Sequence, residues 1–202
     1  VGRQEQFKII PPGVNLGVIP ESHLIRTNLG IPESATVITF LGRITKVKRP
    51  DRFAQVALEI SKQNPSTYFL IVGSGELEEI LKSELSTISL KAKFLGWRND
   101  IENILGATDI LLLTSDNEGT PLSLIQAGMA GLPVVSTNVG SVPEVVLNNV
   151  TGFITSLGIE EIADALEKLV SNKALRAQLG IEAQEFTLAN FGIERLVQDH
   201  EA

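Results

Sequence analysis

The stretch Asp109-Ile-Leu-Leu-Leu-Thr-Ser-Asp-Asn-Glu-Gly-Thr-Pro-Leu-Ser-Leu-Ile-Gln-Ala-Gly-Met-Ala-Gly131 decides the fold of this chain. It begins with an apolar run without alternation, Ile110–Leu113, which predicts a strand covered on both faces. A polar loop follows, and Pro121 is expected in the first turn of a helix, where its missing N–H has no helical partner. Backbone N–H groups around Gly119 to Leu122, together with the helix dipole, predict a site for an anion such as phosphate.

Strands and helices alternate on both sides of this stretch. Residues 8–15 predict a short strand that ends in a turn. The further predicted strands are Thr36–Leu41, Thr67–Val72, Ala92–Leu95, Pro133–Ser136 and, at an edge, Thr151–Ile154. The predicted helices are one turn at Leu24–Leu29, then Arg49–Gln63, Glu76–Ser86, Asp100–Leu105, a short one from Gly140, one from Ile159, Lys173–Asn190 and Ile193–His200. This order predicts an α/β fold, a Rossmann-like open parallel sheet with helices on both faces. Ligands bind such sheets where the strand order reverses, which we expect between the strands that end at Leu41 and Leu113.

Composition excludes several classes of function. The net charge of −7 argues against a nucleic-acid or anionic-membrane binder. The chain has no cysteine, which excludes disulfides and thiolate metal sites and fits a reducing compartment. No apolar stretch approaches the roughly 20 residues of a membrane span, and no part of this sequence is expected to act as a signal peptide. His23 and His200 are expected at the surface, and no cluster has metal-ligand spacing, so no metal is expected.

A second polar loop, Gly42–Arg49, follows the strand that ends at Leu41. It belongs to a local basic cluster, which could equally be a solvated helix start: Arg43, Lys46, Lys48, Arg49 and Arg52. Arg43 and Lys48 can supply positive charge to a diphosphate, and Gly42 allows close backbone approach.

The loop after Leu113 offers groups that suit hydroxyls. Phosphates would repel Glu118, so its useful partner is a sugar hydroxyl. Gln126 is five residues after Pro121, which places it roughly 8 Å from Pro121 along the helix axis. This distance is about the length of a diphosphate. Sugar, diphosphate and ribose together describe a nucleotide-sugar.

Several of these motifs resemble a known family in their order along the chain. They are Gly42-Arg43 with Lys48, Ser115–Ala127, Gly131-Leu-Pro-Val-Val, Val139-Gly-Ser-Val-Pro-Glu144 and Thr151-Gly-Phe. Together they resemble the carboxyl-terminal donor domain of retaining GT-B glycosyltransferases (glycosyltransferase family 4, or group 1). The resemblance implies an interdomain segment and first strand at residues 1–15, a nucleotide-sugar-binding domain at 16–190, and a terminal helix, cut short, at 191–202.

The resemblance also implies roles for individual residues. Arg43 and Lys48 match the pair that neutralises the donor diphosphate and stabilises the leaving group. Glu118 matches the first glutamate of the E-x7-E motif, which contacts the donor sugar. Gln126 stands where the second glutamate usually binds ribose hydroxyls, and the exchange would cost about 1–2 kcal/mol of binding.

Backbone around the site completes the expected donor pocket. Its members are Gly42, Gly119, Thr120, Pro121 and Leu122. Gly140 and Ser141 are expected to approach the phosphates or nucleoside, and Trp97 or Arg98 to line the base pocket. For Trp97, packing in the core or between domains is the favoured alternative.

The family transfers a glycosyl group from a nucleotide-sugar, here UDP- or GDP-linked, to an acceptor with retention at the anomeric carbon. No cofactor is implied. The acceptor comes from an amino-terminal domain, which we expect to be missing because the chain opens at Val1 in an apparent strand. The isolated chain should therefore bind donor nucleotide but transfer little sugar. The whole protein is expected in the cytoplasm, where the missing domain could meet the inner membrane.

Two other functions are compatible with the sequence. One is a different GT-B-like enzyme, such as a sugar-nucleotide epimerase. The other is a non-catalytic nucleotide-sugar-binding module, in which Gln126 would be the first sign of decay. A dinucleotide oxidoreductase does not fit, because Glu78 occupies the place of the third glycine after Gly73-Ser-Gly75.

Overall fold

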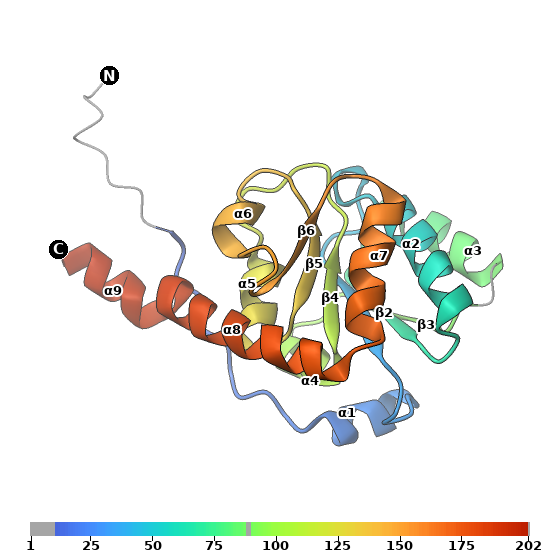
Figure 1. Ribbon diagram of the computed structural model, residues 1–202, viewed down its shortest axis with the longest axis horizontal. Coiled ribbons are helices and arrows are strands. Elements are labelled where there is room, and N and C mark those ends of the chain that lie inside the picture. The colour runs from blue at the N-terminus through green and yellow to red at the C-terminus, as the bar shows by residue number, and fades with distance from the viewer. Residues whose placement is uncertain (1–10, 88–89, 202) are drawn as a thin grey trace.

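Six parallel strands form one open sheet in the computed structural model, which describes residues 11–87 and 90–201 (Figure 1). The strand order is β3-β2-β1-β4-β5-β6. The bounds are β1 Val37–Leu41, β2 Tyr68–Val72, β3 Ala92–Gly96, β4 Ile110–Leu113, β5 Val134–Thr137 and β6 Gly152–Thr155. The order reverses between β1 and β4, where Ile38 is the partner of Ile110 and Thr39 of Leu111. This confirms the predicted point of reversal, and β6 lies at the predicted edge.

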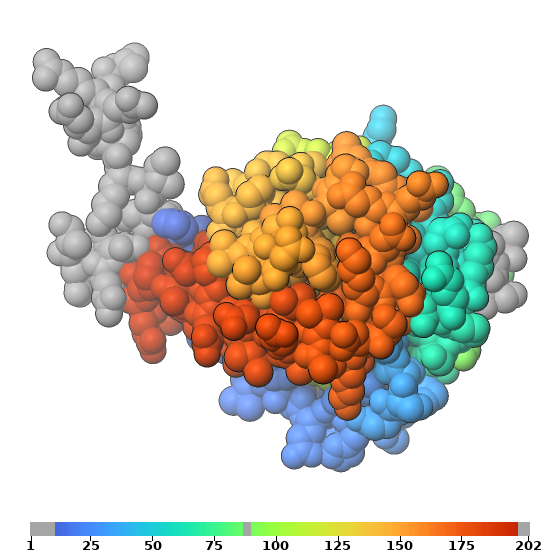
Figure 2. Space-filling view, in the orientation of Figure 1, coloured from blue at the N-terminus to red at the C-terminus, as the bar shows by residue number. Residues whose placement is uncertain are grey.

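Helices cover both faces of the sheet. Their bounds are α1 Ser22–Leu29, α2 Pro50–Gln63, α3 Glu78–Thr87, α4 Ile101–Ala107, α5 Leu122–Met129, α6 Val142–Val145, α7 Ile159–Val170, α8 Lys173–Phe191 and α9 Ile193–Glu201. Residues of α2, α3 and α7 pack with one face in a single core cluster. Residues of α4, α5 and α6 pack with the other face. Figure 2 shows α7 and α8, in orange to red, covering one side of the molecule.

The cores form because the central strands are apolar on both faces. Every residue of β4 is buried, as the run without alternation predicted. On one face, the ring of Phe53 from α2 stands edge-on to Phe40 and Phe69, with centroids 5.4 and 6.2 Å apart. Such contacts fix α2 over β1 and β2. This placement brings the start of α2 to the carboxyl end of β1.

Two expectations about local structure were wrong, at α1 and at Pro121. The strand expected at the start of residues 8–15 falls on residues 8–10, which lie outside the described part, and Val14 makes an isolated bridge with Gly192. Helix α1 begins at Ser22 and is two turns long rather than one. Pro121 is the residue before the first helical one, with φ −74° and ψ 94°, because its ψ is still extended. None of the described helices is both long enough and apolar enough to span a membrane.

The two ends of the described chain are bound to each other. The backbone N–H of Val14 donates to the carbonyl of Phe191 at 2.7 Å. The guanidinium of Arg195 donates to the carbonyls of Pro11 and Pro12 at 2.8 and 3.0 Å. Figure 1 shows this N-terminal segment, in blue, running beside α8 and α9. We call this contact between residues 11–14 and 191–195 the terminal clasp.

Candidate functional site

A hollow of about 350 Å³ opens where the loops after β1 and β4 meet. Its lining includes most of the site residues predicted from the sequence: Gly42, Arg43, Lys48, Glu118, Thr120, Pro121, Leu122 and Gln126. Gly119 is exposed and does not line it. Leu41 and Ser123 also line the hollow and were not predicted. Only their position along the chain could have predicted them, since Leu41 ends the strand before Gly42 and Ser123 is the second residue of α5.

The two predicted cationic residues differ in their surroundings. Arg43 is exposed, and its guanidinium makes no hydrogen bond or ion pair with the described residues. Lys48 is largely buried, and its Nζ lies 2.6 Å from Oε1 of Glu118. One guanidinium is therefore free to meet an anion, while the ammonium is already neutralised.

Glu118 is held in place from three sides. Its carboxylate, only 8% exposed, accepts hydrogen bonds from Lys48 and from Oγ of Ser115 at 2.5 Å. Its backbone carbonyl accepts from the N–H of Ser141 at 3.3 Å. Gly140, with φ +51°, passes so close that a Cβ there would lie 1.7 Å from that carbonyl. Gly140 and Ser141 thus lie behind Glu118 and do not line the hollow.

Unused backbone donors collect at the start of α5. The N–H groups of Gly119, Thr120 and Leu122 have no acceptor among the described residues. The first N–H groups of a helix lack intrahelical partners and carry its positive dipole end, so they attract an anion. The carbonyl of Pro121 accepts the first hydrogen bonds of α5, from the N–H groups of Leu124 and Ile125. The donors expected from the sequence are therefore present at this end.

Gln126 lies one turn into α5 and lines the same hollow. Its side-chain carboxamide makes no hydrogen bond with the described residues, and the residue is half-buried. A carboxamide offers one acceptor oxygen and two N–H donors. The structure therefore leaves both ends of this group available to a ligand.

A second hollow, of about 220 Å³, adjoins the first and shares Leu41, Gly42 and Arg43 with it. Trp97 and Arg98 line it together with Gly73 and Ser74. Trp97 is 74% exposed, so its expected packing in the core was wrong. Arg98 is bound to Asp100, which holds the pKa of that carboxyl well below its usual range. An aromatic face thus stands next to the anion site.

In the rest of the predicted basic cluster Lys46 is exposed, but Arg49 and Arg52 do not form a solvated helix start. Arg49 and Arg52 both bind the carboxylate of Asp116, and Arg49 also binds Asp51. Burial raises the pKa of Asp116, but the hydrogen bonds from Arg52 and Arg49 together outweigh that effect and lower it. The hydrogen bond to Arg49 lowers the pKa of Asp51. These arginines are therefore neutralised by acids of the protein.

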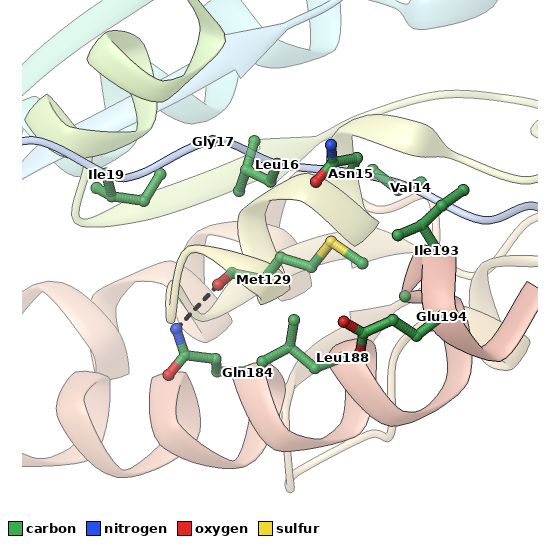
Figure 3. Close-up of a pocket in the computed structure, with 11 residues that line it drawn as sticks. Val14, Asn15, Leu16, Gly17, Ile19, Met129, Gln184, Leu188, Ile193 and Glu194 are labelled. Atoms are coloured by element: carbon green, nitrogen blue, oxygen red, sulfur yellow. Dashed lines mark hydrogen bonds between the residues drawn. The ribbon is translucent and has the colours of Figure 1, made fainter.

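A larger hollow, of about 500 Å³, lies elsewhere, between the N-terminal segment, α5, α8 and α9 (Figure 3). Figure 3 shows Met129 and Leu188 on its walls, with Glu194 at one end, and the hydrogen bond from Gln184 to the carbonyl of Met129. Among the described residues that line it, Glu194 is the only charged one. These residues offer a phosphate no cation, so the smaller hollow at β1 and β4 is the better anion site.

Comparisons with known proteins agree with this geometry. A family model described as glycosyl transferases group 1 matches residues 21–186. A UDP-Gal:alpha-D-GlcNAc-diphosphoundecaprenol alpha-1,3-galactosyltransferase of Escherichia coli is 37% identical over 180 residues, which are 84% of this chain and 46% of that protein. A D-inositol 3-phosphate glycosyltransferase of Corynebacterium jeikeium is 30% identical over 192 residues, covering 86% of this chain and 46% of that protein.

Solved structures share the fold. HepE of Anabaena in complex with UDP and glucose superposes with a TM-score of 0.87 at 23% identity, covering 99% of this chain and 57% of that one. The C-terminal domain of a glycosyl transferase group 1 family protein (LpcC) from Francisella tularensis has a TM-score of 0.76 at 22% identity, covering 91% and 96%. The chain spans about half the length of the curated relatives it matches.

Proposed function

Because this chain belongs to the group 1 glycosyl transferases, we propose that it is the donor domain of a retaining glycosyltransferase that uses a UDP-linked sugar. Its sheet and helices have the fold of the C-terminal half of a GT-B enzyme. The choice of UDP rests on the Escherichia coli relative, whose name specifies UDP-Gal, and on HepE, which was solved with UDP.

The observation that carries the proposal is the makeup of the hollow between β1 and β4. Arg43 and Lys48 stand on the β1 side, and the open N–H groups and Gln126 belong to the β4 side. A diphosphate placed between them would meet charge from one loop and backbone donors from the other. As the bond from the sugar to the phosphate breaks, the charge that develops on the leaving diphosphate is stabilised by the same groups.

The neighbouring groups suit the two ends of a nucleotide-sugar. The carboxylate of Glu118 accepts hydrogen bonds from sugar hydroxyls. The free carboxamide of Gln126 meets ribose hydroxyls, and the exposed face of Trp97 provides a surface for the base. Residues outside this chain bind the acceptor and complete the active site.

A calorimetric titration with UDP, GDP and ADP tests this assignment. We expect the chain to bind UDP best and the Arg43→Ala variant to bind it on the order of tenfold more weakly, because a charge-assisted contact is lost. Lys62→Ala is the matched control, since Lys62 pairs only with Glu59 on the exposed side of α2. If UDP binds and Arg43→Ala has no more effect than the control, the diphosphate site is misplaced.

Sugar transfer separates this proposal from its alternatives. The chain alone should transfer little or no sugar from UDP-galactose, and appreciable turnover by it would contradict the need for further residues. In the whole protein, Glu118→Ala should abolish transfer; a non-catalytic binding module would tolerate it. An epimerase-like enzyme would instead change the sugar of the nucleotide itself, which chromatography of the reacted donor detects.

The titration on Gln126→Glu tests the departure from the family motif. A carboxylate accepts from both ribose hydroxyls, so UDP should bind about 5- to 30-fold more tightly, the equivalent of about 1–2 kcal/mol. If the affinity stays unchanged, the carboxamide already serves the ribose as well as a carboxylate would.

A further inference from the structure

Arg49 has a backbone conformation that its residue type avoids. Its φ of 50° and ψ of 59° lie in the left-handed region, which Asn149 is the only other non-glycine residue of the described chain to occupy. A Cβ is strained in this region, and asparagine tolerates it better than arginine does. Backbone strain of this kind persists only where the surroundings hold it. The contacts of the Arg49 side chain must therefore hold this conformation.

The side chain of Arg49 is clamped between two carboxylates. Its Nε and NH2 atoms donate to Asp51 at 2.9 and 2.7 Å, in the two-pronged geometry of a strong guanidinium pair. Its NH1 atom donates to Asp116 at 3.1 Å. Asp51 is in the first turn of α2, whereas Asp116 belongs to the loop after β4. The clamp thus joins the two loops that form the candidate site.

Further bonds connect the same two loops. Oγ1 of the buried Thr114 donates to the carbonyls of Lys48 and Arg49 at 3.0 and 3.1 Å. The backbone N–H of Asp116 donates to the carbonyl of Val47 at 2.9 Å. Arg52, which is 5% exposed, donates to the carbonyl of Thr114 at 2.6 Å and to Asp116 at 2.8 Å. The backbone on either side of the strand reversal is therefore fixed by polar contacts.

These contacts lie directly beside the groups of the candidate site but do not reach into it. Lys48 precedes Arg49, and Glu118 follows Asp116 by two residues. Neither Arg49 nor Asp51 nor Asp116 lines the hollow. The network can thus affect a ligand only by fixing where Lys48 and Glu118 stand.

We propose that Arg49, clamped by Asp51 and Asp116, is a positioning residue that keeps Lys48 and Glu118 in register across the reversal between β1 and β4. It acts through the two loops and touches no donor itself. This role deepens the proposed function, because the charge that Lys48 presents to a diphosphate depends on it.

Hydrogen exchange of backbone amides tests the clamp without any ligand. Asp51→Asn and Asp116→Asn should each speed exchange in residues 45–49 and 114–118 on the order of tenfold, with the amides of the central strands unchanged. Glu59→Gln is the matched control, since Glu59 pairs with Lys62 in the second half of α2, outside both loops. Exchange that stays as slow in both loops as in the wild type would overturn the proposal.

Arg49→Gly separates the clamp from the turn. Glycine adopts the left-handed conformation without strain, so the turn survives while the guanidinium is lost. We expect the same faster exchange as in the aspartate variants, in a protein that unfolds at or above the wild-type temperature. Wild-type exchange rates in this variant would mean that turn geometry alone holds the loops, and the proposal would fail.

A double-mutant cycle with UDP then measures the effect on the site. Asp116→Asn should weaken UDP binding on the order of three- to tenfold, but should have no further effect in a Lys48→Ala background. A purely structural role would give the same loss in both backgrounds and would overturn the proposal. If the wild-type chain binds no UDP, the proposed donor site fails by itself, and the exchange experiments still decide about the clamp.

Discussion

Replacing Glu118 with glutamine should strengthen the binding of UDP. In the ligand-free protein the carboxylate neutralises Lys48, whose Nζ lies 2.6 Å away, so an incoming diphosphate must compete for that ammonium. Glutamine has the same shape and keeps an oxygen that can accept from Ser115. The substitution therefore removes the competing charge and little else.

The size of the effect follows from the geometry of the pair. Two unit charges 2.6 Å apart attract by about 1.6 kcal/mol in water and by about 6 kcal/mol at an effective dielectric constant of 20. The side chains are 18% and 8% exposed, but desolvation cancels much of the attraction in such pairs. A net competition of about 1–2 kcal/mol remains, which corresponds to a 5- to 30-fold lower dissociation constant for UDP.

Calorimetry at low and high salt measures this gain. Glu118→Gln should bind UDP more tightly than the wild type at low salt, with a smaller advantage at high salt, because screening weakens exposed phosphate contacts. Glu78→Gln makes the same chemical change in a carboxylate that pairs with Lys82, and should leave the affinity unchanged. Equal or weaker UDP binding by a folded Glu118→Gln protein would refute the idea that Glu118 competes with the diphosphate.

Three more predictions concern stability and detection of the ligand. Gly140→Ala should lower the free energy of unfolding in urea by about 2–4 kcal/mol, because its Cβ would meet the carbonyl of Glu118 at 1.7 Å; Gly30→Ala, with a similar φ of +60° and open space, should lose only about 1 kcal/mol. Because the pKa of Asp116 is lowered in the folded protein, its charge stabilises the fold above about pH 4 and less as the pH falls below that value, so the stability gap between wild type and Asp116→Asn should narrow from pH 7 to pH 3. Trp97, the only tryptophan, is 74% exposed beside the anion site, so UDP should change its fluorescence; an unchanged spectrum at saturating UDP would place the base elsewhere.

The sequence predicts the layers of this fold well, because the strands are buried on both faces. An apolar run such as Ile110–Leu113 has one stable place, inside a sheet covered by helices, and the structure confirms it. Helix α2 was equally predictable, since Phe53, Val56, Ala57 and Ile60 form one buried stripe. Segments without periodicity were harder. Residues 16–35 show no regular pattern, and the two turns of α1 were predicted as one.

Most of the residues predicted for the candidate site line one hollow, but the pairing of their charges was not predicted. A local motif names Arg43, Lys48 and Glu118, and the reversal of strand order brings their loops together. The motif does not say which charges pair, because that depends on contacts between segments about 70 residues apart. From the sequence, Arg49 was predicted to belong to a basic cluster. In the structure, the carboxylate of Asp116 neutralises it.

The terminal clasp joins the beginning and the end of the described chain. Val14 is hydrogen-bonded to Phe191, and Arg195 to Pro11 and Pro12, so the two ends of the described chain lie next to each other. A short linker between them would span little distance, so a circular permutant opened at the exposed residues 156–158 should fold to the same sheet. Conversely, a force applied to the two ends would first load the clasp and would reach the six strands only after it had opened.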